Sequence, residues 1–484
     1  MTRTSLRLLL PLCLILSWGC APDVDADDLP PDPEDSDVIL EPGNGPGKED
    51  GPGGIEEASY EGLCILNYVN QATRQDLLDV AHDIPAKEVW KHRVGADGLA
   101  GTEDDNPFET LRELDKVRWV GLITFGRFKS HALARASEFC PQMGQETVLP
   151  GEEDAALAIG RESVNFVTHQ YDKSPPARRD AHAKSHGCVK AFVEVQPDQL
   201  PPEDRVGVFA QSQTYPAWIR FSNGGFLIKT DKKGDVRGLA LKLMDVPGKK
   251  VLDRHQDALT QDFLFINGPA MFVRTPSDYV TFSAKAFDGN PVSFFLSLNP
   301  FDWKWRELTN VIRLTRKKPT NPLRNQYWST TPYRLGDAKA VKYSLRPCDG
   351  MVEKGGWDSD DPDDLLRQNM ADSLQQDEAC FEFLVQRQLD PESTPIEDAT
   401  IEWDEDAAPF VPVATVRIPA QTFDTPEQNQ FCEDLAFNPW HTLPEHQPLG
   451  NVNRVRRVVY DMVSSVRHDL NGVEGAEPTS HELP

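Results

Sequence analysis

Three separate stretches of the chain carry side chains that could handle protons or bind a metal. The first runs from Arg179 to Val195 and reads RDAHAKSHGCVKAFVEV; His182 stands before an alternating run that predicts a strand from Cys188. Histidine suits general acid–base work because its charge changes near neutral pH. A single histidine before a strand is more often an ordinary surface or core residue, so His182 alone predicts no site.

The second stretch, residues 215–225, reads YPAWIRFSNGG and predicts another strand. Side chains two residues apart on a strand point to the same face, so Arg220 and Ser222 share one face. Taken alone, Ser222 also fits a turn residue at the strand's end, before the Asn-Gly-Gly sequence that follows it.

The third stretch, residues 456–467, reads RRVVYDMVSSVR and predicts a helix. Arg456 and Arg467 lie four residues before and seven residues after Tyr460, and both spacings return to the same helical face. A tyrosine has an ordinary pKa near 10, so its phenolate needs a metal or nearby cations. The alternative is a tyrosine on an ordinary amphipathic helix with two basic neighbours.

Together the three stretches resemble the distal-histidine strand, the Arg-x-Ser strand and the proximal-tyrosine helix of haem catalases. Residues 179–184 (RDAHAK) resemble the family's Arg-x-x-His-Ala-Lys, and residues 236–242 (VRGLALK) resemble its Pro-Arg-Gly-Phe-Ala-x-Lys. Residues 435–439 (LAFNP) are similar to its Ile-Ala-Phe-Asp-Pro. The resemblance covers about residues 175–472 and implies a haem cofactor.

The resemblance also implies roles for single residues. His182 would move a proton between the two oxygens of a peroxide, with Ser222 bonded to its ring, and Arg220 would pair with a haem propionate. Tyr460 would be the metal ligand, with Arg456 stabilising its phenolate. The residues expected to bind the cofactor are Arg179, Arg220, Ser222, Tyr279, Arg456, Tyr460 and Arg467.

Several positions depart from the family pattern. In residues 262–274, DFLFINGPAMFVR, the position of the family's catalytic asparagine holds Ile266, and Asn267 follows one residue later. A shift of one residue turns a strand side chain to the other face, so either a bulge brings Asn267 to the site as a catalytic residue or the distal amide is missing. Tyr279 stands where the family has phenylalanine. Residues 461–464 (DMVS) replace its Pro-Asp-Thr-His, and the helical domain of large catalases is expected to be absent.

The N-terminal residues predict export. Residues 1–20 have two arginines before a short apolar run, as in a signal peptide, and Gly19-Cys20 is similar to a bacterial lipoprotein signal. The alternative is cleavage by ordinary signal peptidase. Residues 21–59 are rich in Asp, Glu, Pro and Gly and predict an acidic disordered linker. We expect a periplasmic or cell-surface protein that touches the membrane only through a lipid on Cys20.

The net charge bears on the binding partners of the protein, and the cysteine content bears on its disulfides. The net charge of −27 and pI near 4.8 argue against nucleic acid or an anionic membrane surface as a partner. Beyond Cys13 and Cys20 the chain has six cysteines, which permit disulfides after export in any of fifteen pairings. They are Cys64, Cys140, Cys188, Cys348, Cys380 and Cys432.

The pattern of apolar residues predicts an α+β protein. Residues 60–141 show helical spacing, and residues 114–128 (LDKVRWVGLITFGRF) resemble a helix-hairpin-helix turn. In nucleic-acid enzymes such a turn faces phosphate, but a small structural module fits an exported, acidic chain better. Residues 150–475 predict an antiparallel β-barrel with flanking helices, followed by a tail at 476–484. The expected strands are Cys188–Val195, Ala217–Phe221, Gly238–Met244, Phe263–Ile266, Met271–Arg274, Ala340–Ser344, Phe381–Gln386 and Val413–Ile418.

These features are compatible with three functions. The resemblance favours a haem hydroperoxidase acting on hydrogen peroxide or an organic hydroperoxide. A second possibility is conversion of a fatty-acid hydroperoxide, as in catalase-related allene oxide synthases. The third is a surface lipoprotein that binds haem without catalysis.

Overall fold

The computed structural model describes residues 54–287, 289–297, 303–349 and 363–483. All of them belong to one compact unit, Pro42–Pro484. The predicted signal peptide, with Cys20, and the predicted linker up to residue 53 lie outside the described residues. No helix in the described ranges is long and apolar enough to cross a membrane.

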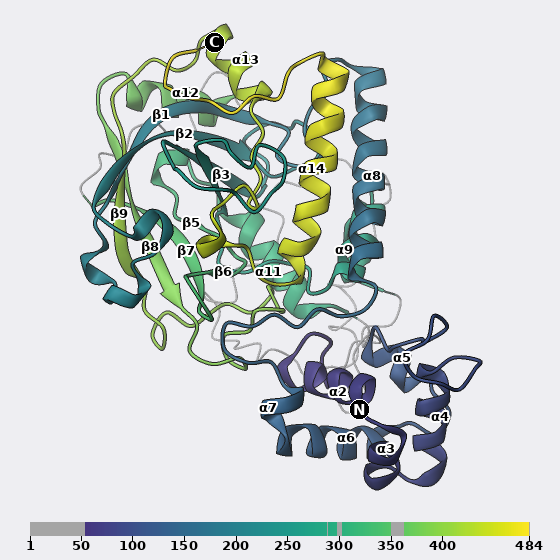
Figure 1. The fold of residues 1–484 in the computed structure, drawn as a ribbon. Coiled ribbons are helices and arrows are strands. Elements are labelled where there is room, and N and C mark those ends of the chain that lie inside the picture. The colour runs from purple at the N-terminus through teal and green to yellow at the C-terminus, as the bar shows by residue number, and fades with distance from the viewer. Residues whose placement is uncertain (1–53, 288, 298–302, 350–362, 484) are drawn as a thin grey trace, which may run out of the picture. The chain divides into compact units, whose positions relative to one another are not determined.

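An antiparallel β-barrel forms the centre of the fold (Figure 1). Eight strands are hydrogen-bonded in the order β5-β4-β3-β2-β1-β9-β8-β7, and the pairing of β5 with β7 closes the barrel. The short strand β6 also pairs with β7. The strands are β1 (Ser185–Val195), β2 (Gln213–Asn223), β3 (Arg237–Met244), β4 (Thr260–Ile266), β5 (Tyr327–Trp328), β6 (Tyr333–Arg334), β7 (Ala340–Pro347), β8 (Ala379–Arg387) and β9 (Val411–Ile418). The predicted α+β barrel class is therefore confirmed.

Helices precede the barrel and cover it. Those before it are α2 (Tyr60–Gln71), α3 (Arg74–Val80), α4 (Asp83–Arg93), α5 (Leu111–Asp115), α6 (Leu122–Ala134) and α7 (Ala136–Phe139). Those around it are α8 (Glu152–Lys173), α9 (Pro276–Phe287), α10 (Val292–Phe295), α11 (Trp305–Arg316), α12 (Leu365–Leu374), α13 (Pro426–Asp434) and α14 (Asn451–Asn471). Short 3₁₀ turns occur at Pro197–Gln199, Pro202–Asp204, Gly207–Phe209, Pro322–Arg324 and Pro444–His446.

Successive side chains along each strand point alternately into the barrel and towards its outer, helix-covered face. On β2, Ala217, Ile219 and Phe221 point into the main apolar core. Arg220 and Ser222 take the opposite face, yet each is only 3% exposed. The outer face of β2 is thus buried under other elements, which allows polar side chains to gather there out of water.

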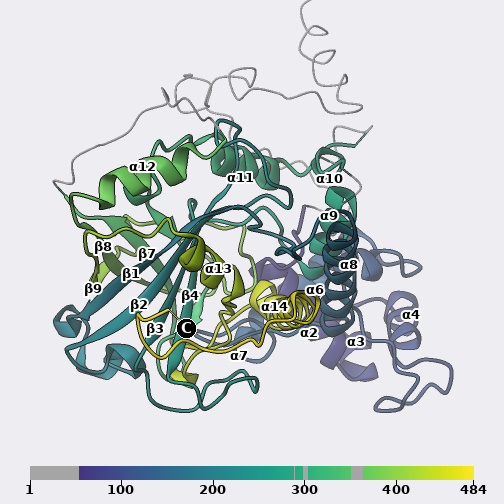
Figure 2. The ribbon, with the colours of Figure 1, turned by 90° about the horizontal axis from the view of Figure 1, so that it is seen from above.

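The pair α8 and α14 stands side by side against the barrel in both views (Figures 1 and 2). The two helices lie close together at Gly160, where an added Cβ would be 2.6 Å from the sulfur of Met462. A small residue is needed there because the helices would otherwise be pushed apart. Their shared apolar seam consists of Ala156, Ile159, Val167, Val455, Val459 and Val463.

The N-terminal helices have an apolar core of their own, which includes Leu66, Val69, Phe125 and Phe128. A disulfide between Cys64 and Cys140 joins the start of this helical module to its end. The other two disulfides join Cys188 to Cys432 and Cys348 to Cys380. These pairings select one of the fifteen that the sequence left open.

Some predicted boundaries differ from the structure. The linker predicted to reach residue 59 ends earlier, because Ile55 and Ala58 are buried and Ser59 caps α2. The strand predicted at Met271–Arg274 is wrong: its alternating burial comes from a loop packed under helices, with the amide of Met271 bonded to Ala399. Residues 476–483 are not a loose tail, since Glu477 forms an ion pair of 2.6 Å with Lys242 on β3.

Candidate functional site

His182 lies in the loop that leads from α8 into β1. Its backbone has φ = +58°, a left-handed conformation that residues other than glycine rarely adopt. The loop is held on both sides: the amide of His182 donates to Gly224 O (3.2 Å), and the carbonyl of His182 accepts from Arg220 Nη2 (2.9 Å). Strain at one residue persists only where its surroundings fix it, and here both backbone groups are fixed.

The ring of His182 is oriented by β2 and β3. Its Nδ1 atom lies 3.0 Å from Ser222 Oγ. The ring rests on Gly238, where an added Cβ would be 2.4 Å from Nδ1, so a larger residue at that position would displace it. Arg220 and Ser222 lie on one strand face, as their spacing predicted, and both contact His182.

His182 is neutral at physiological pH. Burial, together with the nearby positive charges of Arg220, Arg456 and Arg179, lowers the pKa of its imidazole to about 3. The side chain nevertheless keeps part of its surface accessible. A neutral, partly exposed imidazole whose Nδ1 atom is engaged by Ser222 leaves Nε2 able to accept a proton.

Three of the predicted cofactor-binding arginines converge next to His182. Arg179 Nη1 lies 2.9 Å from Glu433 Oε2, and Arg220 Nη2 lies 3.7 Å from Glu433 Oε1. Arg179 and Arg467 both donate to the carbonyl of Leu435, at 2.6 and 3.1 Å. Mutual repulsion and burial lower the pKa of Arg220 and of Arg467 to about 9.

Glu433, to which sequence reasoning gave no role, is the carboxylate among these arginines. Its pKa is lowered because the attraction of Arg179, Arg220, Arg467 and Arg178 together outweighs the effect of burial. One carboxylate cannot neutralise four guanidinium groups, so the cluster keeps a surplus of positive charge. The Nε atom of Arg220 is buried without a hydrogen-bond partner, which leaves a donor for an anionic group.

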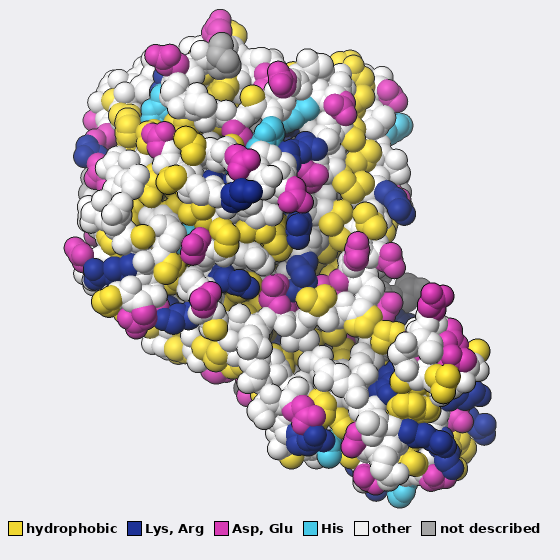
Figure 3. Space-filling view, in the orientation of Figure 1, with side chains coloured by type: hydrophobic (Ala, Val, Ile, Leu, Met, Phe, Trp, Pro, Cys, Tyr) yellow, Lys and Arg dark blue, Asp and Glu magenta, His cyan; other side chains and the backbone are white. Residues whose placement is uncertain are grey.

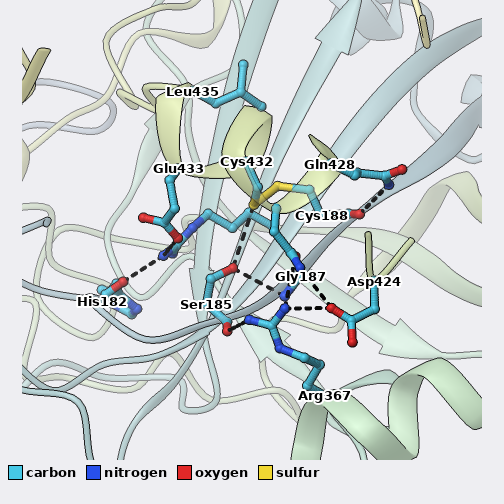
Figure 4. Close-up of a disulfide and its surroundings, with 12 residues drawn as sticks. His182, Ser185, Gly187, Cys188, Arg367, Asp424, Gln428, Cys432, Glu433 and Leu435 are labelled. Carbon is cyan, nitrogen blue, oxygen red and sulfur yellow. Dashed lines mark hydrogen bonds and ion pairs between the residues drawn. A yellow bond between two sulfur atoms is a disulfide. The ribbon is translucent and has the colours of Figure 1, made fainter. Parts of the chain in front are cut away.

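A disulfide fixes the helix that carries Glu433. Cys188 on β1 is bonded to Cys432 on α13, and Glu433 lies beside that bond, on the side of His182 (Figure 4). Gln428 on the same helix donates to the carbonyl of Cys188 at 2.8 Å. The cross-link therefore holds Glu433 against the strand that follows His182.

Tyr460 lies on α14, where its side chain is partly exposed and has no hydrogen bond to any described residue. Burial raises the pKa of its phenol, Arg456 lowers it, and Asp180 raises it. Arg456 Nη1 also donates to Thr331 Oγ1 at 3.2 Å, which holds the guanidinium in place. The hydroxyl of Tyr460 is thus available to a ligand.

Arg456 connects the tyrosine side of the site to the histidine side. Its charge acts on the pKa of Tyr460, Tyr279 and His182 alike. Tyr279 on α9 contacts the apolar clusters on both sides, and burial raises its pKa. Asp180, to which the sequence assigned no role, also acts on both tyrosines, and burial raises its own pKa.

Asn267 does not join this group. Its Oδ1 accepts from the amide of Arg237 at 2.9 Å, and its Nδ2 donates to the carbonyl of Leu314 at 3.1 Å. Both ends of the amide are therefore used to hold backbone. The cross-strand partner of Gly238 is Ile266, and partners in a ladder point to the same face. Since the His182 ring rests on Gly238, the β4 side chain on that face is Ile266.

Solved structures with a similar fold include three catalases. They are a fungal catalase (17% identity over 62% of this chain and 61% of that chain, TM-score 0.48), catalase A from Saccharomyces cerevisiae (18%, 63% and 65%, TM-score 0.50) and a bacterial catalase (16%, 64% and 62%, TM-score 0.46). This chain has a catalase-like fold. It spans about three fifths of the length of these catalases.

At these identities the likeness concerns the fold alone. No family model matches the chain, and no curated protein matches its sequence. In this chain His182 precedes β1, Arg220 and Ser222 lie on β2, and Arg456 and Tyr460 lie on α14.

Proposed function

We propose that this chain is a haem-dependent hydroperoxidase that uses His182 as its acid–base group and Tyr460 as its metal ligand. The carrying observation is that the charge of Arg456 acts both on a neutral imidazole oriented by Ser222 and on a phenol that has no hydrogen bond to a described residue. Neither group has another evident use. A catalase-like fold agrees with the proposal.

The side chains present fit a haem. A haem brings two propionates, and the cluster of Arg179, Arg220 and Arg467 has surplus positive charge and an unpaired Arg220 donor. The hydroxyl of Tyr460, which has no hydrogen bond to a described residue, would supply a protein ligand to the haem iron. Among the described residues, no group of three or more His, Cys, Asp or Glu side chains could hold a metal ion.

When bound, a haem would supply the redox chemistry that cleaves a peroxide bond. The work of His182 is to take a proton from one peroxide oxygen at Nε2 and to return it to the departing oxygen. Ser222 keeps the ring in the orientation for that transfer. Because the imidazole is neutral, it starts in the form that accepts a proton.

Tyr460 would hold the iron as a phenolate. Without a metal the burial of its phenol favours the protonated form, so metal binding must displace the proton. Arg456 assists because its positive charge stabilises the phenolate. Asp180 opposes this effect, which would make the ligand more electron-rich.

The side chain at position 266 favours an organic hydroperoxide over hydrogen peroxide. Ile266 belongs to an apolar cluster with Phe282, Phe294 and Phe295, and Tyr279 packs against it. An aliphatic group beside His182 offers no hydrogen bond to orient a small peroxide, and it favours contact with an apolar substituent. Conversion of a fatty-acid hydroperoxide is the second candidate for the same reason.

One set of measurements tests the proposal. The purified protein mixed with haem should give a Soret band with charge-transfer bands of a phenolate ligand. It should consume an organic hydroperoxide in the presence of a reductant and release little oxygen from hydrogen peroxide. A fatty-acid hydroperoxide consumed without any reductant would favour the second candidate. A normal Soret band with neither activity would leave haem binding alone, and no haem binding would refute the proposal.

We also propose that the chain is exported and anchored through a lipid on Cys20. The support is the pattern of residues 1–20 and the three disulfides among the remaining cysteines, which are typical of an oxidising compartment. Cys20→Ser should release the protein from membranes washed at high salt, which weakens contacts made only through surface charge. An unchanged distribution would exclude the anchor.

A further inference from the structure

The helical module exposes three large apolar side chains within five consecutive residues. Trp119, Leu122 and Ile123 are 61%, 65% and 73% exposed, at the corner where the chain turns from α5 into α6. Single exposed apolar residues are ordinary, but a contiguous group marks an interaction site. The proposed haem chemistry makes no use of this corner.

The turn is built so that the tryptophan points outward. Trp119 has φ = +68°, a conformation that is unusual for a bulky side chain. Its neighbours hold it there, since Val120 is buried, its amide donates to Val117, and the carbonyl of Gly121 accepts from Phe125. The fold therefore tolerates backbone strain at a residue whose side chain it leaves in water.

Positive charge surrounds the apolar corner. Between Leu111 and Ala134 the chain has five Lys or Arg and two acidic residues, a net charge of +3 in a protein whose total is −27. Lys116, Arg118 and Arg127 form no ion pair with the described residues, and the Arg118 guanidinium lies 5.4 Å from the Trp119 ring centre. Figure 3 shows Lys and Arg side chains gathered beside hydrophobic ones on this module.

We infer that this corner docks onto the surface of an anionic phospholipid bilayer. Trp is the side chain that most favours the membrane interface, and Leu and Ile next to Lys and Arg are the composition of an interfacial anchor. The total charge of the chain does not prevent this contact, because charges more than about 8–10 Å away are screened at physiological salt. Three side chains are also too few for a stable protein interface, which buries about 800 Å² on each partner.

The test uses the exported chain with Cys20→Ser, so that no lipid on the protein contributes to binding. The protein is sedimented with vesicles of phosphatidylcholine alone or with a quarter of phosphatidylglycerol. We expect binding to the anionic vesicles and weaker binding as salt rises. Trp119→Ala combined with Leu122→Ser and Ile123→Ser should weaken it at least about tenfold, since each removed apolar group loses interfacial burial. Lys116→Glu and Arg118→Glu should each cost about fivefold on anionic vesicles only.

A matched control lies in the same module. Leu99 is 62% exposed but stands in the acidic loop of residues 97–105, which an anionic surface repels, so Leu99→Ser should bind as the parent does. Circular dichroism must show each variant folded, and Trp119→Ala alone serves if the triple variant is not. Failure of the parent to bind at low salt, or equal binding by the corner variants, would overturn the inference. So would a parent dimer that the corner variants dissociate, or preferential binding of duplex DNA.

Discussion

The Nδ1 atom of His182 lies 3.0 Å from the Oγ atom of Ser222, although 40 residues separate them in the sequence. The contact exists because β2 pairs with β1 in a register that brings Ser222 opposite Ser185, close to the loop that carries His182. The ring is oriented by protein atoms alone. A proton-handling group that is oriented in advance does not have to be ordered during the reaction.

Removing this hydroxyl should slow turnover without affecting haem binding. Ser222→Ala should lower kcat/KM for an organic hydroperoxide about 10- to 100-fold, as expected when a residue that orients a reactive one is lost. His182→Ala should cost more, about 10²–10⁴-fold, because it removes the acid–base group itself. Ser465→Ala is the control, since that hydroxyl instead accepts from Arg254. Equal rates for Ser222→Ala and the parent protein would mean that the contact has no role in turnover.

Tyr460→Phe should abolish or strongly weaken haem binding, because it removes the oxygen that we assign to the metal. Titration with haem, followed by the Soret band, measures this effect. Tyr215→Phe is a matched control: only burial shifts the pKa of Tyr215, with no contribution from a residue of the site, so the loss of its hydroxyl should leave haem binding unchanged. Normal charge-transfer bands in Tyr460→Phe would show that another group holds the iron.

The barrel was predictable because most of its strands alternate in the sequence. The eight antiparallel strands bury one face in a common core, and this gives a period of two that is visible without the structure. The same signal misled at Met271–Arg274, where alternating burial comes from a loop packed against helices. Periodicity reports which side chains are buried, and it does not report whether their backbone is paired.

The relative positions of site residues could be predicted from the sequence where two of them lie on the same strand or helix. Arg220 with Ser222, and Arg456 with Tyr460, are fixed by the periods of one strand and one helix. Glu433 carries no such signal, because its partners Arg179 and Arg220 come from distant segments. For Asn267 the sequence left two possibilities, and only the register of β3 with β4 shows that Ile266 takes the face of His182.

Glu433→Gln should destabilise the haem-free protein and strengthen haem binding. The carboxylate offsets the mutual repulsion of the arginines, so its loss should lower the free energy of unfolding by about 1–3 kcal/mol, less than for a fully buried pair. The same loss leaves more positive charge for the propionates and should lower the Kd for haem severalfold. Denaturant unfolding and haem titration measure the two effects. Weaker haem binding in the variant would mean that Glu433 positions the arginines and does not compete with the propionates.

The kcat/KM for a hydroperoxide should not change between pH 8 and pH 5. The pKa of His182 is about 3, so its imidazole stays neutral as the pH falls from 8 to 5, and kcat/KM should remain flat there. The stability of the fold, unlike the activity, should depend on pH in this range. Between pH 6.5 and 3 only the unfolded chain protonates this histidine, so the free energy of unfolding falls as the pH drops. A loss of kcat/KM centred near pH 6.5, in protein that circular dichroism shows to be folded, would contradict the assignment.

Ile266→Asn should shift the preference towards hydrogen peroxide. An amide at this position would give a small peroxide the hydrogen bond that the aliphatic side chain cannot give, and one such donor changes a rate by about 10²–10³-fold in other sites. We therefore expect oxygen release from hydrogen peroxide to rise at least about tenfold, with a lower kcat/KM for a bulky organic hydroperoxide. Ile266→Val keeps the site apolar and should change neither. Unchanged oxygen release by folded, haem-loaded Ile266→Asn would show that position 266 does not set the choice of peroxide.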